Sequence, residues 1–275
     1  MVNISTLKTT PAAHAPVHPL GYGPLHGPRR NEHIVVVLGV GPGLGLSIAS
    51  VFAAQGYTTA ILSRSKERLD QWAQELDTVA RARLEQDGEC PAKDEPLSLA
   101  FACDMLEQST IHGAMQAIQN AWPKRYIGTC AYNGSIRKRG PFLDIPFHKI
   151  EESVAASIFA FFTFAQLTLR AMDKHGMGGS LLVTGASSST RGAEGFAPFA
   201  AAKSIAREFG EKNVHVAHII IDGLVESKTA LQYLGLPADE RFEDGVLAKT
   251  WLFLAQQDQS AWTFELDIRP AKEKF

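Results

Sequence analysis

The sequence predicts a doubly wound α/β fold, in which helices cover both faces of a mainly parallel, seven-stranded sheet. Three observations carry this prediction. Short apolar runs rich in β-branched residues, such as 34–38, alternate with longer segments that have helical spacing. Several of these runs are apolar at every position, which is typical of parallel strands buried on both faces. A cluster of glycines separates the first strand from the first helix, where the backbone must turn sharply.

The elements follow in order from local pattern. β-branched and apolar runs predict strands at 34–38, 58–62, 97–103, 127–132, 180–184, 214–221 and 262–268. Helical spacing predicts helices at 46–55, 66–86, 111–122, 150–175, 199–209 and 238–257. The helix 66–86 has a polar face, whereas 150–175 is apolar almost throughout and is expected to be buried. Its most apolar stretch, 154–169, is too short to span a bilayer comfortably.

Composition sets the domain boundaries and excludes some classes of protein. Residues 1–32 are rich in proline, glycine and histidine without a period, so we expect a flexible N-terminal tail before a single domain at 33–275. The net charge of −2 argues against a protein whose field alone holds nucleic acid. The three cysteines are far apart and form no ligand cluster, so neither a disulfide framework nor a structural metal site is expected. A cytoplasmic protein without a secretory signal or a membrane partner fits these features.

The glycine cluster carries the first functional prediction. Gly39, Gly43 and Gly45 match the spacing G-x-x-x-G-x-G, whereas G-x-G-x-x-G fails because residue 44 is leucine. Glycines let the backbone approach a pyrophosphate closely, and the helix that follows points its free N–H groups at the phosphates. The order of strand, glycines and apolar helix predicts a Rossmann-type dinucleotide site, with Gly41 and Leu44 in the same loop.

The end of the second strand indicates which dinucleotide. An acid that would bind the ribose 2′-hydroxyl of NAD is absent there, and Ser63, Arg64 and Ser65 stand in its place. A guanidinium forms charge-assisted and often bidentate contacts with phosphate. The predicted cofactor is therefore NADP(H).

With these motifs, the chain resembles the short-chain dehydrogenase/reductase superfamily, and the resemblance covers residues from about 34 to 275. The three glycines match its glycine motif, although Leu38 replaces the usual threonine. The resemblance implies that Asp104 contacts the adenine and that Asn133, followed by Gly134, is the surviving asparagine of the N-N-A-G motif. It also implies that the segment containing Gly223, Val225 and Ser227 covers the nicotinamide, with Asp222 in the place of a proline.

The catalytic positions depart from the family's pattern. Its Y-x-x-x-K motif maps onto Phe199 and Lys203, so the lysine remains for coenzyme binding and catalysis while the tyrosine hydroxyl is missing. Ala186 occupies the position of the serine and is followed by Ser187, Ser188 and Ser189. The helix asparagine of the family's proton relay maps onto Ser157.

The missing hydroxyl leaves three hypotheses open. The first is an NADPH-dependent oxidoreductase that reduces a C=O, C=C or C=N bond of a small organic substrate such as a secondary metabolite. Its proton would come from Ser187, Ser188, Tyr132 or a water held by Lys203, with Arg191 or Glu194 as further replacements. A substrate such as an iminium would need no acid at all. The second is a cyclase or isomerase that uses the cofactor pocket without redox chemistry, and the third is an NADP(H)-binding regulatory protein.

Three further predictions concern packing and assembly. His215 and His218 lie three apart on one strand and therefore face opposite sides, so we interpret both as structural. The phenylalanines at 159, 161, 162 and 164 surround a helix, which indicates a core or a subunit interface. Only ten residues separate Lys203 from the next strand, which shortens a helix that the family uses between subunits. A homo-oligomer through that helix is therefore in doubt.

Overall fold

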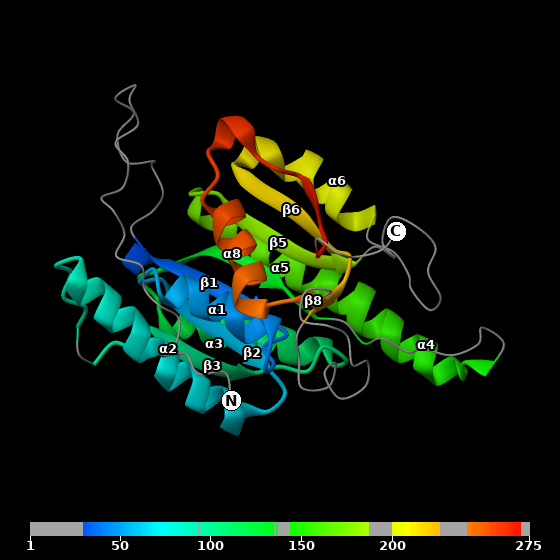
Figure 1. Ribbon diagram of the computed structural model, residues 1–275, viewed down its shortest axis with the longest axis horizontal. Coiled ribbons are helices and arrows are strands. Elements are labelled where there is room, and N and C mark those ends of the chain that lie inside the picture. The colour runs from blue at the N-terminus through cyan, green and yellow to red at the C-terminus, as the bar shows by residue number, and fades with distance from the viewer. Residues whose placement is uncertain are drawn as a thin grey trace.

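The computed structural model describes residues 30–92, 94–134, 136, 144–186, 200–225 and 241–270, except for the side chains of residues 31 and 200–204. Within these ranges the chain forms a three-layered α/β domain with a central sheet (Figure 1). The first described element is a turn of 3₁₀ helix at Arg30–Glu32. Arg30 contacts the Asp87 carboxylate at 2.8 Å and the Gln55 carbonyl at 3.0 Å, so this turn packs against the domain.

The central sheet has seven strands in the order β3-β2-β1-β4-β5-β6-β9, and every pairing is parallel. This confirms the predicted fold class. The strands are β1 (His33–Leu38), β2 (Thr58–Ser63), β3 (Ser98–Ala102), β4 (Tyr126–Tyr132), β5 (Gly179–Ala186), β6 (Val214–Ile221) and β9 (Glu265–Ile268). The order reverses between β1 and β4, and ligands of such sheets bind beyond the carboxyl ends of the strands at this point.

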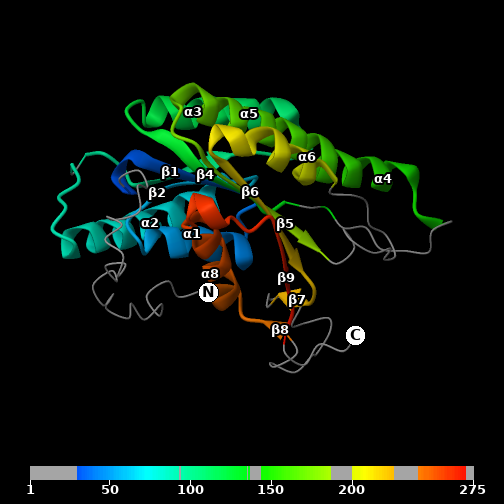
Figure 2. The ribbon, with the colours of Figure 1, turned by 90° about the horizontal axis from the view of Figure 1, so that it is seen from above.

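Helices cover both faces of the sheet (Figure 2). α1 (Leu44–Ala53), α2 (Lys66–Gln86) and α8 (Asp244–Ala255) lie on one face. α3 (Gln108–Ala121), α4 (Phe147–Val154), α5 (Ala160–His175) and α6 (Ala200–Phe209) lie on the other.

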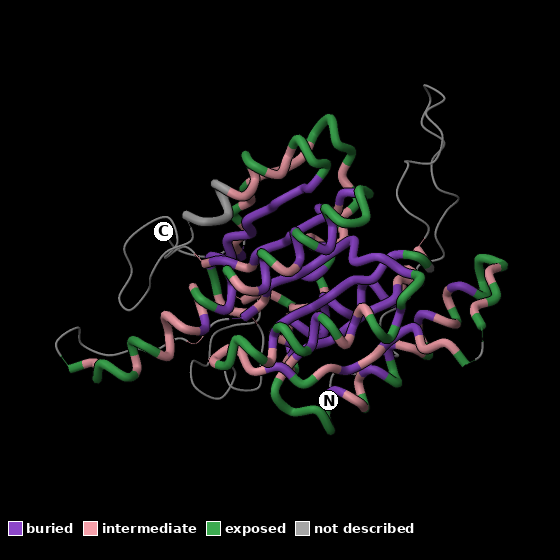
Figure 3. The backbone as a smooth tube through the Cα atoms, turned by 180° about the vertical axis from the view of Figure 1, so that it is seen from behind, coloured by how far each residue is buried: buried purple, intermediate pink, exposed green. Residues whose placement is uncertain are grey.

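Alternation along the strands divides the core in two. In β1, Ile34 and Val36 face the layer of α3 and α5, whereas Val35 and Val37 face the layer of α1 and α8. All four are fully buried, which explains why this strand is apolar at every position. The tube coloured by burial shows the same arrangement, with buried strands between helices whose outer sides are exposed (Figure 3).

The long apolar helix consists of three parts. α4 passes through a π-helical turn at Ala155–Phe159 into α5. The π turn inserts a residue into the helical repeat, which the regular spacing of the sequence does not predict. Among the described residues, one helix is long and apolar enough to cross a membrane, namely Phe147–His175; this judgement uses length and composition alone. Its inner side is instead core: Phe161 and Phe164 are buried, while Phe159 and Phe162 are 53% and 46% exposed.

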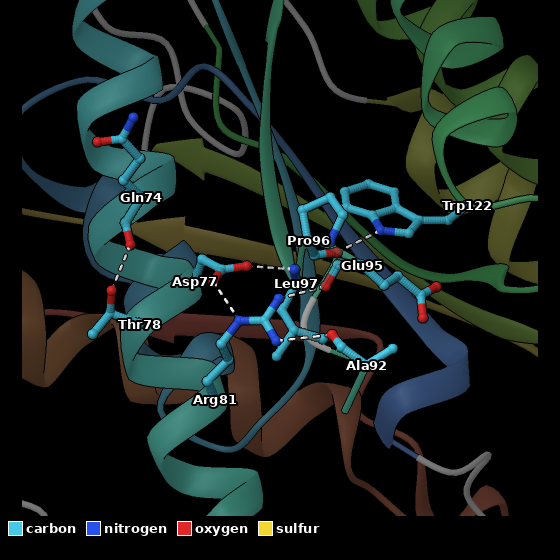
Figure 4. Close-up of polar contacts among 9 residues, drawn as sticks. All are labelled: Gln74, Asp77, Thr78, Arg81, Ala92, Glu95, Pro96, Leu97 and Trp122. Carbon is cyan, nitrogen blue, oxygen red and sulfur yellow. Dashed lines mark hydrogen bonds and ion pairs between the residues drawn. The ribbon is translucent and has the colours of Figure 1, made fainter. Parts of the chain in front are cut away.

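The segment that leads into β3 is held by α2 (Figure 4). Asp77 accepts a hydrogen bond from the Leu97 amide, and its other oxygen pairs with Arg81 at 2.8 Å. Arg81 also donates to the carbonyls of Ala92 and Glu95. Two half-buried side chains of α2, Asp77 and Arg81, therefore fix the loop between α2 and β3.

The described part of 241–270 differs from expectation in two elements. The helix predicted from residue 238 begins at Asp244, because Arg241–Phe242 forms a short strand, β8, with β7 (Leu224–Val225). The last strand begins at Glu265 rather than at Trp262. Trp262 instead stacks on the His215 ring, with centroids 5.0 Å apart.

A buried histidine at the start of β1 makes stability depend on pH. Burial lowers the pKa of His33 from 6.5 to about 4, and its Nε2 lies 2.9 Å from the Thr129 hydroxyl. The unfolded chain binds a proton near pH 6.5 and the folded chain only near pH 4. The free energy of unfolding should therefore fall as the pH drops through this window, by up to about 3 kcal/mol.

Replacing His33 with phenylalanine should flatten this part of the stability profile, because the aromatic ring remains and the titrating group is lost. Urea unfolding at pH 7.5, 6 and 5 measures the difference between the two proteins. If both lost stability equally between pH 7.5 and 5, the assignment to His33 would be wrong.

Candidate functional site

The glycine loop lies between β1 and α1, at the carboxyl edge of the sheet. The amides of Gly39 and Val40 donate to the Leu62 carbonyl of β2 at 3.0 and 3.1 Å. The Leu46 and Ser47 amides donate back to the carbonyls of Gly41 and Gly43. The loop is thus tied both to the neighbouring strand and to the first turn of its own helix.

Two glycines are required by close contacts. Gly39 has a φ of +89°, and a Cβ added there would stand 2.4 Å from the Asn133 carbonyl oxygen. A Cβ at Gly45 would stand 2.4 Å from the Gly39 carbonyl oxygen. A Cβ at Gly41 would meet nothing within 4 Å among the described residues, so this glycine borders open space.

The N-terminus of α1 has the properties of an anion site. The helix begins at Leu44 with Gly43 as its N-cap, no side chain caps it, and no acidic residue lies in its first turn. The first amides of a helix have no acceptor within the helix, and the helix dipole adds positive potential there. A pyrophosphate fits these groups, since the uncapped amides and the missing side chains leave both donors and room for it.

Arg64 lies beside this loop. Leu62 accepts the loop's hydrogen bonds, and Arg64 follows two residues later, just beyond the end of β2. Arg64 and Ser65 are exposed, Ser63 is half-buried, and Arg64 forms no ion pair with any residue that the structure describes. Of the two acidic residues nearest to Arg64 on α2, Glu67 lies in the first turn and is exposed, and Asp70 pairs with Lys66 at 2.6 Å. The guanidinium is therefore available to an anion bound at the loop.

Asp104 lies just beyond the end of β3 and is half-buried. Its Oδ1 accepts from the Leu106 amide at 3.0 Å, and its own amide donates to the Thr110 hydroxyl at 2.9 Å. These bonds hold the turn before α3. They position the carboxylate on the same edge of the sheet as Arg64, on the strand next to β2.

Asn133 forms the side of the site opposite Arg64. It follows β4, its amide donates to the Leu38 carbonyl at 2.9 Å, and its Nδ2 donates to the Gly39 carbonyl at 3.2 Å. Gly134 packs closely against Met105, whose sulfur would lie 2.0 Å from an added Cβ. The structure thus brings Asn133 and Gly134 to the glycine loop.

The structure argues against Tyr132 as a proton donor. The side chain is fully buried, and its hydroxyl donates to the Ala156 carbonyl in the π turn. The ring packs against Phe161 and Phe164, and burial raises the pKa of the phenol. A proton held by a buried main-chain carbonyl is not available to a substrate, so Tyr132 has a packing role.

The remaining catalytic positions are only partly described. Ser157 is half-buried within the π turn, Ala186 ends β5, and the main chain of Lys203 lies in the first half of α6. The other predicted residues lie outside the described residues: Ser187, Ser188, Ser189, Arg191, Glu194, Phe199 and Ser227.

The segment expected to cover the nicotinamide starts from an anchored residue. Asp222 is buried, its amide donates to the Ile268 carbonyl at 2.8 Å, and its carboxylate lies 3.3 Å from the Arg269 guanidinium. Gly223 and Val225 follow directly, the latter within β7. The sequence does not indicate that Arg269 is part of this site, because only the pairing of β6 with β9 brings it to Asp222.

The two histidines of β6 have separate partners. His215 Nε2 lies 2.8 Å from the Thr263 carbonyl, and burial lowers the pKa of this imidazole. His218 Nδ1 lies 3.1 Å from the Glu265 carboxylate of β9. The contacts support the interpretation of both residues as structural.

Comparisons with known proteins agree with this geometry. The family model described as short chain dehydrogenase matches residues 33–221. No curated protein matches the sequence. A solved short-chain dehydrogenase from Rhodopseudomonas palustris is 29% identical, with a TM-score of 0.64 over 88% of this chain and 100% of its own.

More distant structures share the fold. A variant of actinorhodin polyketide ketoreductase with NADPH is 15% identical, with a TM-score of 0.69 over 87% of this chain and 96% of its own. An alcohol dehydrogenase from the archaeon Thermococcus sibiricus, complexed with 5-hydroxy-NADP, is 16% identical, with a TM-score of 0.68 over 88% and 98%. With most of its domain matched by the family model, the chain belongs to the short-chain dehydrogenase family.

Proposed function

We propose that the protein is an NADP(H)-dependent oxidoreductase that reduces a C=O, C=C or C=N bond of a small organic substrate. The observation that carries the choice of coenzyme is Arg64, which lies beside an uncapped glycine loop without a carboxylate partner among the described residues. A ribose 2′-phosphate supplies the partner that this guanidinium lacks. The ketoreductase with NADPH and the alcohol dehydrogenase with 5-hydroxy-NADP, which share the fold, fit this proposal.

Each part of the site has a role in binding. The amides at the start of α1 bind the pyrophosphate, Arg64 and the hydroxyls of Ser63 and Ser65 bind the 2′-phosphate, and Asp104 faces the adenine. Asn133 and Gly134 form the wall next to the glycine loop. Lys203, Gly223, Val225 and Ser227 enclose the nicotinamide end. The bound coenzyme supplies a hydride, and the protein orients it toward the substrate.

The proton must come from a group other than tyrosine. Phe199 has no hydroxyl, and Tyr132 is held in the core. Ser187, Ser188 or a water held by Lys203 remain as donors, and a positioned acid contributes about 10²–10⁴ in rate. An iminium substrate needs no donor, because hydride addition to it gives a neutral amine.

The absorbance of NADPH at 340 nm, followed over a panel of ketones, enones and imines, tests the oxidoreductase. We expect oxidation with at least one class. Product formation without net oxidation of NADPH would instead indicate a cyclase or isomerase. Coenzyme binding without any product would indicate a regulatory protein.

Replacing Lys203 with alanine should weaken NADPH binding about tenfold, because a charge-assisted contact to the coenzyme is lost. Replacing Phe199 with tyrosine need not raise activity, since the chain uses another donor or none. Calorimetry measures the affinity, and Lys249→Ala on the exposed side of α8 is the matched control. An unchanged affinity in Lys203→Ala would overturn the assignment of this lysine.

Two broader features stay predictions. The exposed side chains of Phe147, Phe159 and Phe162 are what a homo-oligomer would bury. The three cysteines are unpaired, which fits a reducing, cytoplasmic location.

A further inference from the structure

A hydrogen-bonded chain of side chains connects the end of β5 to the glycine loop. The Thr184 hydroxyl donates to Asn133 Oδ1 at 3.0 Å. Asn133 Nδ2 donates in turn to the Gly39 carbonyl at 3.2 Å. Three segments that are distant in the sequence are thereby joined through one amide, whose oxygen and nitrogen each have a partner.

The Asn133 amide controls the geometry of the loop by contact as well as by hydrogen bonding. An added Cβ at Gly39 would collide with the Asn133 main chain, and one at Gly45 would stand 3.0 Å from Nδ2. The loop therefore lies directly on Asn133. A rotation of this side chain would move the Gly39 carbonyl and the amides that follow it.

Thr184 holds the oxygen end of the amide. The Gly39 carbonyl only accepts hydrogen bonds, so the Asn133 nitrogen faces Gly39. The Thr184 hydroxyl donates to Oδ1 on the β5 side and so anchors the amide in this orientation. Thr184 also stands two residues before Ala186, the position that corresponds to the family's serine. It therefore links the strand end at the substrate side to the coenzyme loop.

We propose that Thr184 is a positioning residue for the coenzyme, acting through the orientation of the Asn133 amide on the glycine loop. The proposal rests on the proposed function, because it takes the glycine loop as the coenzyme site. Thr184 is half-buried and belongs to no motif that the sequence analysis identified.

Replacing Thr184 with valine tests the proposal, because valine keeps the shape and removes the hydroxyl. We expect about fivefold weaker NADPH binding by calorimetry, and about fivefold faster hydrogen exchange of the amides in residues 39–47 without coenzyme. Thr184→Ser should restore both values to within about twofold, since serine keeps the donor. If Thr184 acted through packing alone, the opposite order would result: valine would keep the wild-type values, and serine, which lacks the methyl group, would not.

Thr129→Val is the matched control. Thr129 lies on the adjacent strand, and its buried hydroxyl contacts His33 at the other end of the sheet from the loop. It should leave NADPH affinity and loop exchange unchanged. Normal NADPH binding by both the wild-type protein and Thr184→Val would overturn the role of Thr184 alone. If the wild-type protein bound no nicotinamide coenzyme, the proposed function would fail and this inference with it.

Discussion

Replacing Arg64 with alanine is expected to weaken NADPH binding by about 10- to 100-fold and to leave NADH binding within about twofold. The guanidinium stands beside the glycine loop and has no ion-pair partner among the described residues. Only NADPH carries the 2′-phosphate, so only its affinity includes this charge-assisted contact. Because Arg64 is exposed, the difference between the two coenzymes should shrink at high salt.

Calorimetric titration of both coenzymes into the wild-type protein and into Arg64→Ala measures this effect. Arg170→Ala is the control, since Arg170 is also an exposed arginine but lies on α5, in the layer on the opposite face of the sheet from α1. An equal loss for NADPH and NADH would show that Arg64 does not contact the 2′-phosphate. No loss for either would remove it from the site.

Replacing Gly39 with alanine is expected to lower the free energy of unfolding by about 2–4 kcal/mol. At a φ of +89° an alanine is strained, and its Cβ would stand 2.4 Å from a main-chain oxygen of Asn133. Main chain at the end of a buried strand has little freedom to move away. The fraction that still folds should bind no NADPH, because relieving the collision separates the loop from Asn133.

Gly41→Ala is the matched control from the same loop. A Cβ there meets none of the described residues within 4 Å, so the stability of this variant should lie within about 0.5 kcal/mol of the wild-type protein. Urea unfolding of the two variants gives the comparison. If Gly39→Ala were as stable as Gly41→Ala, the close approach of the loop to Asn133 would be disproved.

The sheet was predictable from the sequence because its strands are buried on both faces. Burial of every position in β1 and β6 leaves a run of apolar residues with few other interpretations. The short strand at Arg241–Phe242 was not predictable, since two residues carry no period. The π turn was missed for a related reason: a single inserted residue leaves the apolar pattern of α4 and α5 nearly unchanged.

The glycine loop was predictable because the sharp turn of the backbone between the first strand and the first helix itself calls for glycines, and their spacing is visible in the sequence. Contacts that join distant segments were not. Tyr132 was a plausible donor in the sequence, and only the packing of β4 against the π turn shows that its hydroxyl donates to the Ala156 carbonyl. Thr184 could have been noticed as a polar residue ending the apolar run 181–183, but its partner Asn133 depends on the pairing of β4 with β5.

Calorimetry of the wild-type protein with NADPH, NADP⁺, NADH and NAD⁺ tests the central claim most directly, namely that the glycine loop and Arg64 together form an NADP(H) site. The proposed site predicts saturable binding of NADPH, at least tenfold tighter than that of NADH. Well-folded protein that gives no binding heat with any of the four coenzymes would contradict it.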